Sequence, residues 1–529
     1  PLLIAAAGRM SAQAAQVAQR ARALSAGERR HEHGGGAALA RALALDSPDG
    51  MALLSLAEAL LRVPDAAGAD RLIRDQLAGI DRHAGAVRGP LTWALRAAAS
   101  LAPVSERPGP RQLTMPLLRR CLRLAMGRLG GQFVFAQTIE SALRRARRGA
   151  GAHYRYSFDM LGEAALTDQD ARGYLAAYGQ ALHAVGSANP PHRGLAGDSV
   201  SVKLSALHPR YGYTQQSRLR AQLLPRMRAL ALLARRYQIA LTIDAEEAER
   251  LEPSLELIEA LMADAALADW PGLGVAVQAY QKRAPAVIDY LAALAVRRGQ
   301  PLAVRLVKGA YWDLEIKLAQ QAGLTGYPVY TRKVYTDVAY LACARRLLVA
   351  RPHLVPQFAT HNACTVAAIV ELAGSDAGAD PGTGPGMEFQ CLHGMGTALY
   401  RELARQEEET WPVRIYAPVG ARAALLPYLM RRLLENGGGS SFVHRAARAS
   451  ARSLTADPAA LAARLGGAPH PRIVLPRDLF RPGRCNSAGI DLADEGQRAA
   501  LLRAIEAGRR TPIGIEPIIA APDAARGRA

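Results

Sequence analysis

One stretch near residue 430 combines side chains that could bind a small carboxylate. On an α-helix, Tyr428, Arg431, Arg432 and Glu435 fall at i, i+3, i+4 and i+7 and therefore share one face. Each guanidinium can offer a planar pair of donors to a carboxylate, and the tyrosine ring can cover an apolar substrate body. A solvated amphipathic helix explains the same spacing, so the rest of the chain has to decide between the two interpretations.

Other polar residues follow short β-rich runs farther up the chain. We predict eight strands, at 154–160, 199–204, 239–244, 274–278, 302–307, 355–360, 387–391 and 414–417. Helical periodicity lies between them, at 168–185, 222–237, 255–263, 285–297, 313–322, 331–350 and 363–372. Alternation of eight strands with helices predicts a (β/α)8 barrel, which is an α/β fold. No GxGxxG follows a strand, and this argues against a doubly wound sheet.

The carboxyl ends of barrel strands are where active sites form. Seven of the predicted strands end near polar residues, namely Lys203, Asp244, Gln278, Arg305, Thr360, Gln390 and Tyr416. Further candidates follow the fifth, sixth and seventh strands: Lys308, Gly309, Ala310, Tyr311, Trp312, His361, Asn362, Leu392 and His393. We therefore predict one large polar site at this end of the barrel, with the arginine-bearing stretch as the eighth helix.

Segments on both sides of the barrel have different compositions. Residues 1–36 are rich in Ala and Arg, helix-prone over 11–24, and are predicted to form an arm. Residues 37–150 show strong helical periodicity and are predicted to form an all-helical domain, followed by the barrel at 151–445. Residues 446–529 are irregular, with a helix near 494–507, and are interpreted as a linker and the start of a truncated domain. The first residue is Pro, which suggests a chain cut upstream.

Composition excludes several classes of protein. The net charge is +20 over 529 residues, but only five of the 66 basic residues are lysines, all between residues 203 and 333. We interpret this charge as a solvated arginine-rich surface, while a nucleic-acid or anionic membrane surface stays open as an alternative. The five cysteines form no CxxC pair, which favours a reducing cytoplasm. No apolar run reaches the roughly 18 residues that a membrane span needs.

Several runs are similar to those of the proline dehydrogenase barrel in the proline utilization A family of bifunctional bacterial flavoenzymes. These runs are 155–165, 202–211, 243–247, 278–283, 305–313, 358–362, 390–396 and 428–437. Residues 37–150 resemble the helical domain of that family. Residues 475–480 and 486–489 resemble the lead-in to its NAD-dependent aldehyde dehydrogenase domain. We see no ribbon-helix-helix segment at the N-terminus, so nucleic acid is not an expected partner.

The resemblance implies FAD as cofactor and L-proline as substrate. Proline would be oxidised to Δ1-pyrroline-5-carboxylate by hydride transfer from C5 to flavin N5. The residues implied around proline are Lys203, Arg431 and Arg432 for its carboxylate, Tyr311, Leu392, Tyr416 and Tyr428 as walls, and Asp244, which would hydrogen-bond in the pocket or orient Tyr416. The residues implied around FAD are Gln278, Arg305, Lys308, Gly309, Ala310, Trp312, Thr331, Thr360, His361, Asn362, Gln390, Arg432 and Glu435.

The same resemblance implies partners beyond the substrate. A membrane quinone would reoxidise the flavin, and the arginine-rich surface would help a cytoplasmic protein to associate with the inner face of the bacterial plasma membrane. The full-length protein would also have NAD-dependent glutamate-semialdehyde dehydrogenase activity. The oligomeric state stays open, a homo-oligomer included.

Plainer interpretations accompany several of these residues. Trp312 could belong to the core, His361 could be a satisfied strand-end histidine, and Glu435 could be an i,i+4 partner of Arg431. His361 and His393 lack a third ligand at a metal spacing, so no metal is expected. Pro427 could kink the eighth helix. A basic nucleic-acid-binding or interaction scaffold with an inactive barrel is therefore the alternative function.

Overall fold

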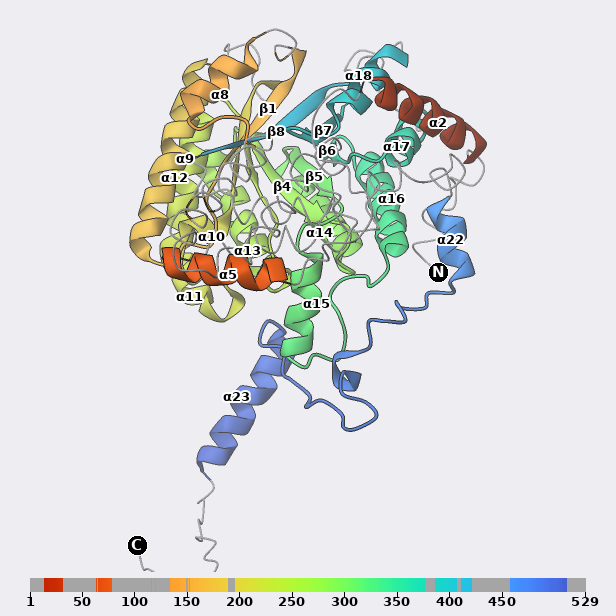
Figure 1. The fold of residues 1–529 in the computed structure, drawn as a ribbon. Helices are drawn as coiled ribbons and strands as arrows, with labels where there is room; N and C mark the ends of the chain where they lie inside the picture. The colour runs from red at the N-terminus through yellow and green to blue at the C-terminus, as the bar shows by residue number, and fades with distance from the viewer. Residues whose placement is uncertain are drawn as a thin grey trace, which may run out of the picture.

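Eight parallel strands close into a barrel in the computed structural model, which describes residues 14–31, 63, 65–78, 116, 119, 134–148, 151, 153–188, 196–375, 386–406, 411–420 and 457–510 (Figure 1). In chain order the strands are β1 Arg155–Met160, β2 Ser199–Val202, β3 Leu241–Ile243, β4 Leu273–Gln278, β5 Leu302–Val307, β6 Leu354–Ala359, β7 Glu388–Leu392 and β8 Val413–Val419. β1 pairs with both β2 and β8, which closes the ring. The predicted (β/α)8 fold is confirmed.

Alternate residues of the strands face two different environments. One set is apolar and packs between the strands and the surrounding helices; Phe158, Val200 and Val304 in it are fully buried. The other set is polar and points into the barrel. There the hydroxyl oxygens of Ser157 and Ser201 lie 2.9 Å apart. This period of two follows from strand geometry, because successive side chains point to opposite faces. The barrel interior is therefore a polar column.

Helices follow the strands and surround the barrel. They are α9 Asp168–Ala188, α12 Leu224–Arg236, α13 Leu251–Met262, α14 Ala284–Arg298, α15 Trp312–Gln321, α16 Lys333–Val349, α17 Ala363–Ser375 and α18 Thr397–Gln406. A π-helical stretch, Leu219–Leu223, leads into α12, and the short α10 Leu204–Leu207 follows β2. Of the eight helices named before these, all but α18 correspond to predicted helices, and α10 was not predicted.

The bounds of α14 show how the sequence sets one of these helices. Pro285 lies in its first turn, where a missing N–H costs nothing, and Gly299 ends the helix with φ 70°. Ile288, Leu291 and Ala295 recur on one face and are buried. The sequence thus specifies the start, the end and the packed side of this helix.

The helix α2 Ala14–His31 packs against the outside of the barrel, beside α17 and α18 (Figure 1). Ala21 and Leu24 are fully buried there, and Arg20 Nε donates to Glu371 Oε1 at 2.9 Å. The observed helix extends past the predicted range of 11–24 by several residues. Another described helix of the N-terminal region is α5 Ala66–Ala78, and α8 Ile139–Ala146 directly precedes the barrel.

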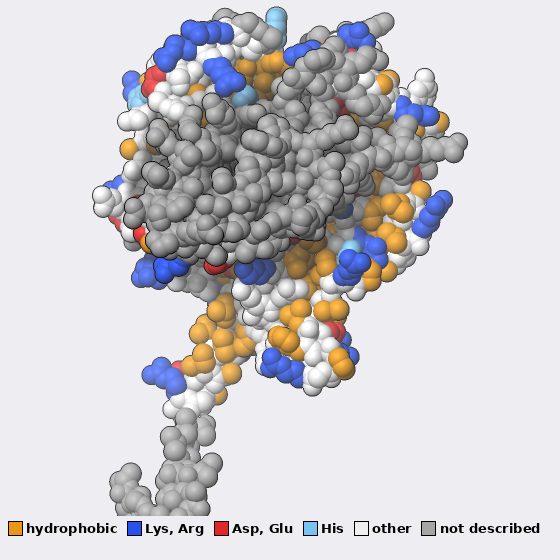
Figure 2. Space-filling model, viewed as in Figure 1, with side chains coloured by type: hydrophobic (Ala, Val, Ile, Leu, Met, Phe, Trp, Pro, Cys, Tyr) orange, Lys and Arg blue, Asp and Glu red, His pale blue; other side chains and the backbone are white. Residues whose placement is uncertain are grey.

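The C-terminal segment 457–510 first runs along the barrel surface and then turns away from the barrel. Ala459 and Ala462 of α22 Pro458–Arg464 pack against Val338 of α16. Farther on, the backbone N–H of Gly489 donates to the carbonyl of Gly323 at 2.8 Å. The last described helix, α23 Glu495–Arg509, projects away from the barrel with no buried residue (Figure 1). Figure 2 shows hydrophobic side chains gathered on this projecting part.

Candidate active site

Lys203 lies directly after β2 and is enclosed at the carboxyl end of the barrel, with 6% of its surface exposed. Its ammonium donates three hydrogen bonds, to Asp159 Oδ1 at 2.7 Å, Asp244 Oδ2 at 3.2 Å and the Tyr416 hydroxyl at 3.2 Å. Burial opposes the charged form, but Asp159 and the other two partners outweigh it and hold the pKa of Lys203 well above its ordinary value. The site therefore contains a fixed positive charge.

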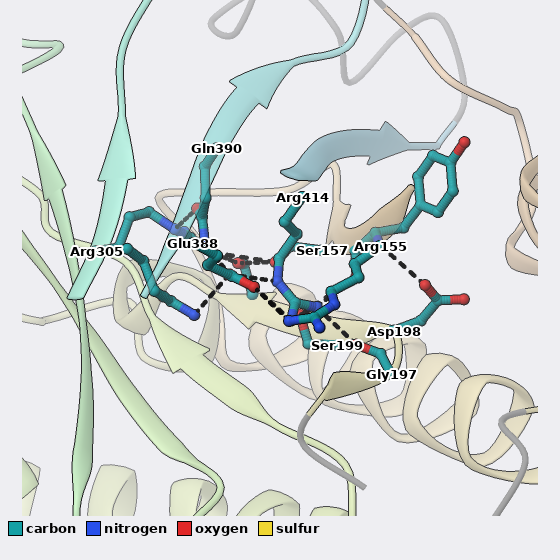
Figure 3. Close-up of polar contacts among 12 residues, drawn as sticks. Arg155, Ser157, Gly197, Asp198, Ser199, Arg305, Glu388, Gln390 and Arg414 are labelled. Atoms are coloured by element: carbon teal, nitrogen blue, oxygen red, sulfur yellow. Dashed lines mark hydrogen bonds and ion pairs between the residues drawn. The ribbon is translucent and has the colours of Figure 1, made fainter. Parts of the chain in front are cut away.

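Arg305 supplies a second fixed cation from the middle of β5. Its Nη1 donates to Asp244 Oδ1 at 2.6 Å, and its Nε donates to Gln390 Oε1 at 2.7 Å. Its Nη2 donates to the hydroxyls of Ser157 and Ser201 at 3.1 and 2.9 Å. Figure 3 shows the Arg305 side chain reaching across the barrel interior toward Gln390 and Ser157. The planar guanidinium is thus held along all its edges.

Asp244, just after β3, joins the two cations. Burial favours its neutral form, but Lys203 and Arg305 outweigh burial and lower the pKa of Asp244. Tyr416 donates its hydroxyl hydrogen to Asp244 Oδ2 at 2.7 Å. The Tyr416 ring centroid lies 5.9 Å from the Lys203 ammonium and 5.1 Å from the Arg305 guanidinium carbon. Burial raises the pKa of Tyr416 well above its ordinary value, so the phenol stays protonated.

Asp159 completes this cluster, although the sequence analysis did not single it out. It is fully buried near the end of β1 and accepts the shortest of the Lys203 hydrogen bonds. Burial raises the pKa of Asp159, and the hydrogen-bonded Lys203 ammonium offsets this only in part. Asp159 could have been identified from its position, because an acidic residue two positions after Ser157 lies on the same inward face of a predicted strand.

A second polar layer lies beneath the first, toward the strand beginnings, and it too was missed (Figure 3). Glu388, the first residue of β7, accepts from Arg414 Nε at 2.7 Å and from Gln357 Nε2 at 2.9 Å. Gln390 Nε2 also donates to Glu388 Oε1, at 2.8 Å, while Gln390 Oε1 accepts from Arg305. Burial would raise the pKa of Glu388, but Arg414 holds it below its usual value. Gln390 therefore links the two layers.

Gln278 and the loop after β5 form another connected part of the site. Gln278 Nε2 donates to the Glu246 carbonyl at 2.7 Å, and the N–H of Ala310 donates to Gln278 Oε1 at 3.3 Å. Gly309 has φ 133°, and a Cβ there would lie 2.5 Å from the ring of Tyr280. Only glycine fits at this point, both for its backbone conformation and for space.

Lys308 and Trp312, on either side of this loop, are anchored by other elements. Lys308 Nζ forms an ion pair with Asp337 of α16 and lies 3.4 Å from Thr365 Oγ1 in the first turn of α17. Trp312 Nε1 donates to the Tyr330 carbonyl at 2.8 Å, and its ring packs at the edge of a small apolar cluster. Trp312 thus has a packing role in the structure.

The residues after β6 are joined by local hydrogen bonds. Thr360 Oγ1 accepts from the Asn362 N–H at 3.2 Å, and Asn362 Oδ1 accepts from the Thr365 N–H at 3.1 Å, where α17 begins. His361 Nε2 accepts from the Leu392 N–H at 3.0 Å, which joins the ends of β6 and β7. Accepting at Nε2 requires the imidazole tautomer whose proton is on Nδ1.

The remaining predicted residues fall in different places. Tyr311 is half-buried at the start of α15, and Thr331 Oγ1 accepts from the His470 N–H at 3.0 Å, away from the barrel axis. The predicted residues that lie outside the described part of the chain are Pro427, Tyr428, Arg431, Arg432 and Glu435. The structure therefore brings together Lys203, Asp244, Arg305, Gln390 and Tyr416, with Gln278 and the Gly309 loop beside them.

The described residues contain no group of three or more His, Cys, Asp or Glu side chains placed to hold a metal ion. Among the helices described, none has both the length and the apolar composition needed to cross a bilayer.

Comparison with known families decides the interpretation of this polar cluster. A family model described as "Proline dehydrogenase" matches residues 142–445, which include the barrel and all of its strand-end residues. The chain belongs to the proline dehydrogenase family. This confirms the resemblance inferred from the sequence and places the chain in a family of enzymes. A second model, described as "DNA-binding domain of Proline dehydrogenase", matches residues 37–133.

Individual relatives extend over nearly the whole chain. The Bifunctional protein PutA of Salmonella typhimurium is 48% identical over 510 residues, which cover 92% of this chain and 38% of that protein. Its counterpart from Rhizobium meliloti is 46% identical and is covered over 40% of its length. A crystal structure of a mutant Proline Utilization A from Bradyrhizobium japonicum has a TM-score of 0.74 and 44% identity, over 94% of this chain and 51% of that one. The chain thus spans about two fifths of the length of these curated relatives.

The second family match bears on the expected partners. Its description concerns DNA binding by that domain, whereas the sequence analysis expected no nucleic-acid partner. Most of residues 37–133 fall outside the described ranges, and α5 is the main part that is described. The absence of a nucleic-acid partner stays a prediction.

Proposed function

We propose that this chain catalyses the FAD-dependent oxidation of L-proline to Δ1-pyrroline-5-carboxylate. The observation that carries the proposal is the buried cluster of Lys203, Asp244, Arg305 and Tyr416 at the carboxyl ends of the strands, within a chain of the proline dehydrogenase family. The two cations are paired with Asp159 and Asp244, and Arg431 and Arg432 would add the further charge that suits a substrate with one carboxylate and a small apolar ring.

The residues around the Gly309 loop fit a dinucleotide such as FAD. The bare backbone at Gly309 allows close approach, and the loop leads directly into the N-terminus of α15. Lys308 lies between this loop and the first turn of α17. A lysine beside two helix N-termini favours the negative charge of a pyrophosphate. We assign Gln278, Arg305, Lys308, Gly309 and Ala310 to the cofactor on this basis.

For the remaining cofactor assignments, we propose roles that follow the sequence prediction. Trp312 begins α15 directly after the loop, and Gln390 contacts Arg305. Thr360, His361 and Asn362 follow β6, where His361 contacts the end of β7. Thr331 contacts the C-terminal segment, so we place it at the outer edge of the cofactor site. Arg432 and Glu435 complete the proposed set.

FAD, when bound, supplies the acceptor for the hydride that leaves C5 of proline. The task of the protein is then to hold the ring in a reactive orientation. Lys203 already donates three hydrogen bonds within the cluster, so we assign to it a fixed positive charge near the substrate carboxylate. Arg431 and Arg432 would provide the direct two-pronged contacts. Tyr311, Leu392, Tyr416 and Tyr428 would form the walls.

Asp244 has a positioning role in this proposal. Both of its oxygens accept hydrogen bonds, one from Arg305 and the other from Lys203 and Tyr416. Its lowered pKa keeps it ionised. We therefore assign Asp244 to orienting the Tyr416 phenol, and we do not assign to it the removal of a substrate proton.

The later steps rest on the resemblance alone. We propose that a membrane quinone reoxidises the flavin, and that the arginine-rich surface supports peripheral association with anionic lipid from the cytoplasmic side. A longer chain, such as the relatives described as bifunctional, would add NAD-dependent glutamate-semialdehyde dehydrogenase activity. No step of the proposed reaction depends on the oligomeric state of the protein.

Anaerobic spectroscopy tests the proposed function. The purified protein, after incubation with FAD, should show the absorbance of oxidised flavin, and L-proline should bleach it. A protein that binds no flavin would contradict the cofactor assignment. A yellow protein whose spectrum persists in excess L-proline would favour the inactive-scaffold alternative.

A further inference from the structure

Glu315 is a buried acidic residue that the proposed reaction does not use. It lies in the first turn of α15 with 3% of its surface exposed. Its Oε1 accepts from the Ala248 N–H at 2.7 Å and from the Tyr280 hydroxyl at 3.4 Å. One carboxylate therefore contacts both the loop after β3 and the end of β4.

The contact at Ala248 falls where the loop lacks a partner of its own. Ala248 begins a short 3-10 helix, Ala248–Arg250, and Glu247, which precedes it, makes no side-chain capping hydrogen bond. The free N–H groups at the start of such a turn need acceptors. Glu315 supplies one from a different element, 67 residues farther along the chain.

The loop held in this way carries Asp244. It runs from Asp244 through Glu246 to Arg250. Arg283, which precedes α14, donates from Nη2 to the Ala248 carbonyl at 2.8 Å, and two further contacts join the loop to β4 and to the elements after β4 and β5. The first is Gln278, which connects the Glu246 carbonyl to the Ala310 N–H. The second is Glu315, which also contacts Tyr280, the residue whose ring lies against Gly309. Two bridges therefore join the Asp244 loop to the proposed cofactor loop.

A carboxylate at this position is costly for the fold. Burial raises the pKa of Glu315 to about 7, and the nearby Glu247 and Glu249 act in the same direction, while the Ala248 N–H and the Tyr280 hydroxyl act against it. The carboxyl group keeps an acceptor oxygen for the Ala248 N–H, 2.7 Å away, in both of its protonation states. The contact with Ala248 can therefore restrain the loop whether Glu315 is ionised or neutral.

We propose that Glu315 is a positioning residue, which holds the loop 244–250 through the Ala248 N–H and thereby sets Asp244 against Arg305 and Tyr416. The proposal rests on the proposed oxidation of proline, because Asp244 acts in that reaction by orienting Tyr416. Glu315 touches neither Asp244 nor Tyr416 through any described hydrogen bond. Its effect would reach the site only through the loop.

Three variants test this role in the flavin-loaded protein. Glu315→Ala removes the acceptor and should lower kcat/KM for L-proline about tenfold, mainly through kcat, because orientation and not substrate charge is changed. Glu315→Gln keeps a carbonyl acceptor of the same length and should stay within about twofold of the wild type. Glu249→Ala, a truncation of an exposed acid in the same loop, is the matched control and should match the wild type.

Hydrogen exchange gives a measurement that does not depend on activity. Amides of the peptide 244–250 should exchange faster in Glu315→Ala and at the wild-type rate in Glu315→Gln. If Glu315→Ala does not fold, Glu315→Asp withdraws the acceptor by one methylene and should show the same changes to a smaller extent. Unchanged exchange in the Ala or Asp variant, or a Gln variant as impaired as the Ala variant, would overturn the proposal.

The outcomes distinguish this proposal from the proposed function. If wild-type protein with bound flavin is not bleached by L-proline, the proposed oxidation fails, and faster exchange in Glu315→Ala would still establish the restraint on the loop. If the wild type is bleached and the Ala variant is equally fast, the positioning role of Glu315 is refuted.

Discussion

At the scale of single residues, the site is a balance of buried charges. Lys203 and Arg305 carry two positive charges, and Asp159 and Asp244 can carry two negative ones within the same cluster. Buried ions persist when they are paired and hydrogen-bonded, and removal of one partner leaves an uncompensated charge. The substrate carboxylate therefore needs further cations, which is consistent with the proposed roles of Arg431 and Arg432.

Lys203→Met tests this charge balance. The change leaves Asp159 and Asp244 without their ammonium partner, so we expect a loss of about 3 to 5 kcal/mol in the free energy of unfolding. Chemical denaturation with the flavin present measures it. Lys317→Met removes an exposed lysine on α15 and should change the stability by less than about 0.5 kcal/mol. Similar stability in the two variants would mean that the cluster does not depend on the ammonium.

Tyr416→Phe tests the phenol separately from the ring. The variant keeps the ring as a wall but removes the hydroxyl that joins Lys203 and Asp244. We expect kcat/KM for L-proline to fall about tenfold while flavin binding is retained, because loss of the two hydrogen bonds of this hydroxyl should cost about 1 to 2 kcal/mol. Steady-state kinetics with a flavin content assay measures both quantities. Kinetic constants equal to those of the wild type would show that the Tyr416 hydroxyl has no role in the reaction.

At the scale of elements, periodicity was the informative signal. All eight strands were predicted close to their observed bounds, because each combines β-rich residues with an alternation between core and polar positions. By the same logic Lys203 and Asp244 were predicted at strand ends, where they lie, whereas Arg305 lies in the middle of β5. Asp159, Glu388 and Arg414 were missed, since their partners lie on other strands and no local spacing connects them. The helix α18 was also not predicted.

Gly309→Ala tests the loop between β5 and α15. A residue with a side chain is strained at φ 133°, and its Cβ would meet the Tyr280 ring at 2.5 Å. We expect a loss of about 1 to 3 kcal/mol in stability and weaker retention of FAD. Gly326→Ala is the matched control, because a Cβ at Gly326 meets no atom within 4 Å. Equal thermal stability and equal flavin content in the two variants would contradict the role given to Gly309.

At the scale of the whole molecule, the segment 457–510 makes contacts that the sequence did not reveal. Its interpretation as a linker and the start of a truncated domain stays a prediction. Within this segment, Val474 accepts a hydrogen bond at its carbonyl from Tyr327 at 2.6 Å, and Ala468 accepts one from Arg332 at 2.9 Å. These contacts use backbone carbonyls, which leave no mark in the sequence. Long-range packing of this kind cannot be read from local composition.

The dependence of global stability on pH gives a further prediction. Glu315 has its pKa raised from 4.5 to about 7, so the folded state binds its proton more tightly than the unfolded state does. The stability that the protonated Glu315 side chain gives to the folded state is fully present below about pH 4.5 and is lost as the pH rises through about 7. Glu315→Gln should therefore have a higher Tm than the wild type at pH 8. We expect its free energy of unfolding to exceed that of the wild type by up to about 3 kcal/mol at pH 8, and by much less at pH 5. Calorimetry at both pH values decides this, and a difference that is independent of pH would contradict it.

The most direct test of the central claim is the rate of flavin bleaching when L-proline is deuterated at C5. The account predicts that anaerobic L-proline reduces the bound flavin, that Δ1-pyrroline-5-carboxylate is the product, and that deuterium at C5 slows the bleaching markedly while deuterium at C3 does not. A flavin that L-proline leaves oxidised, or bleaching that is insensitive to deuterium at C5, would contradict the assignment of this site to proline oxidation.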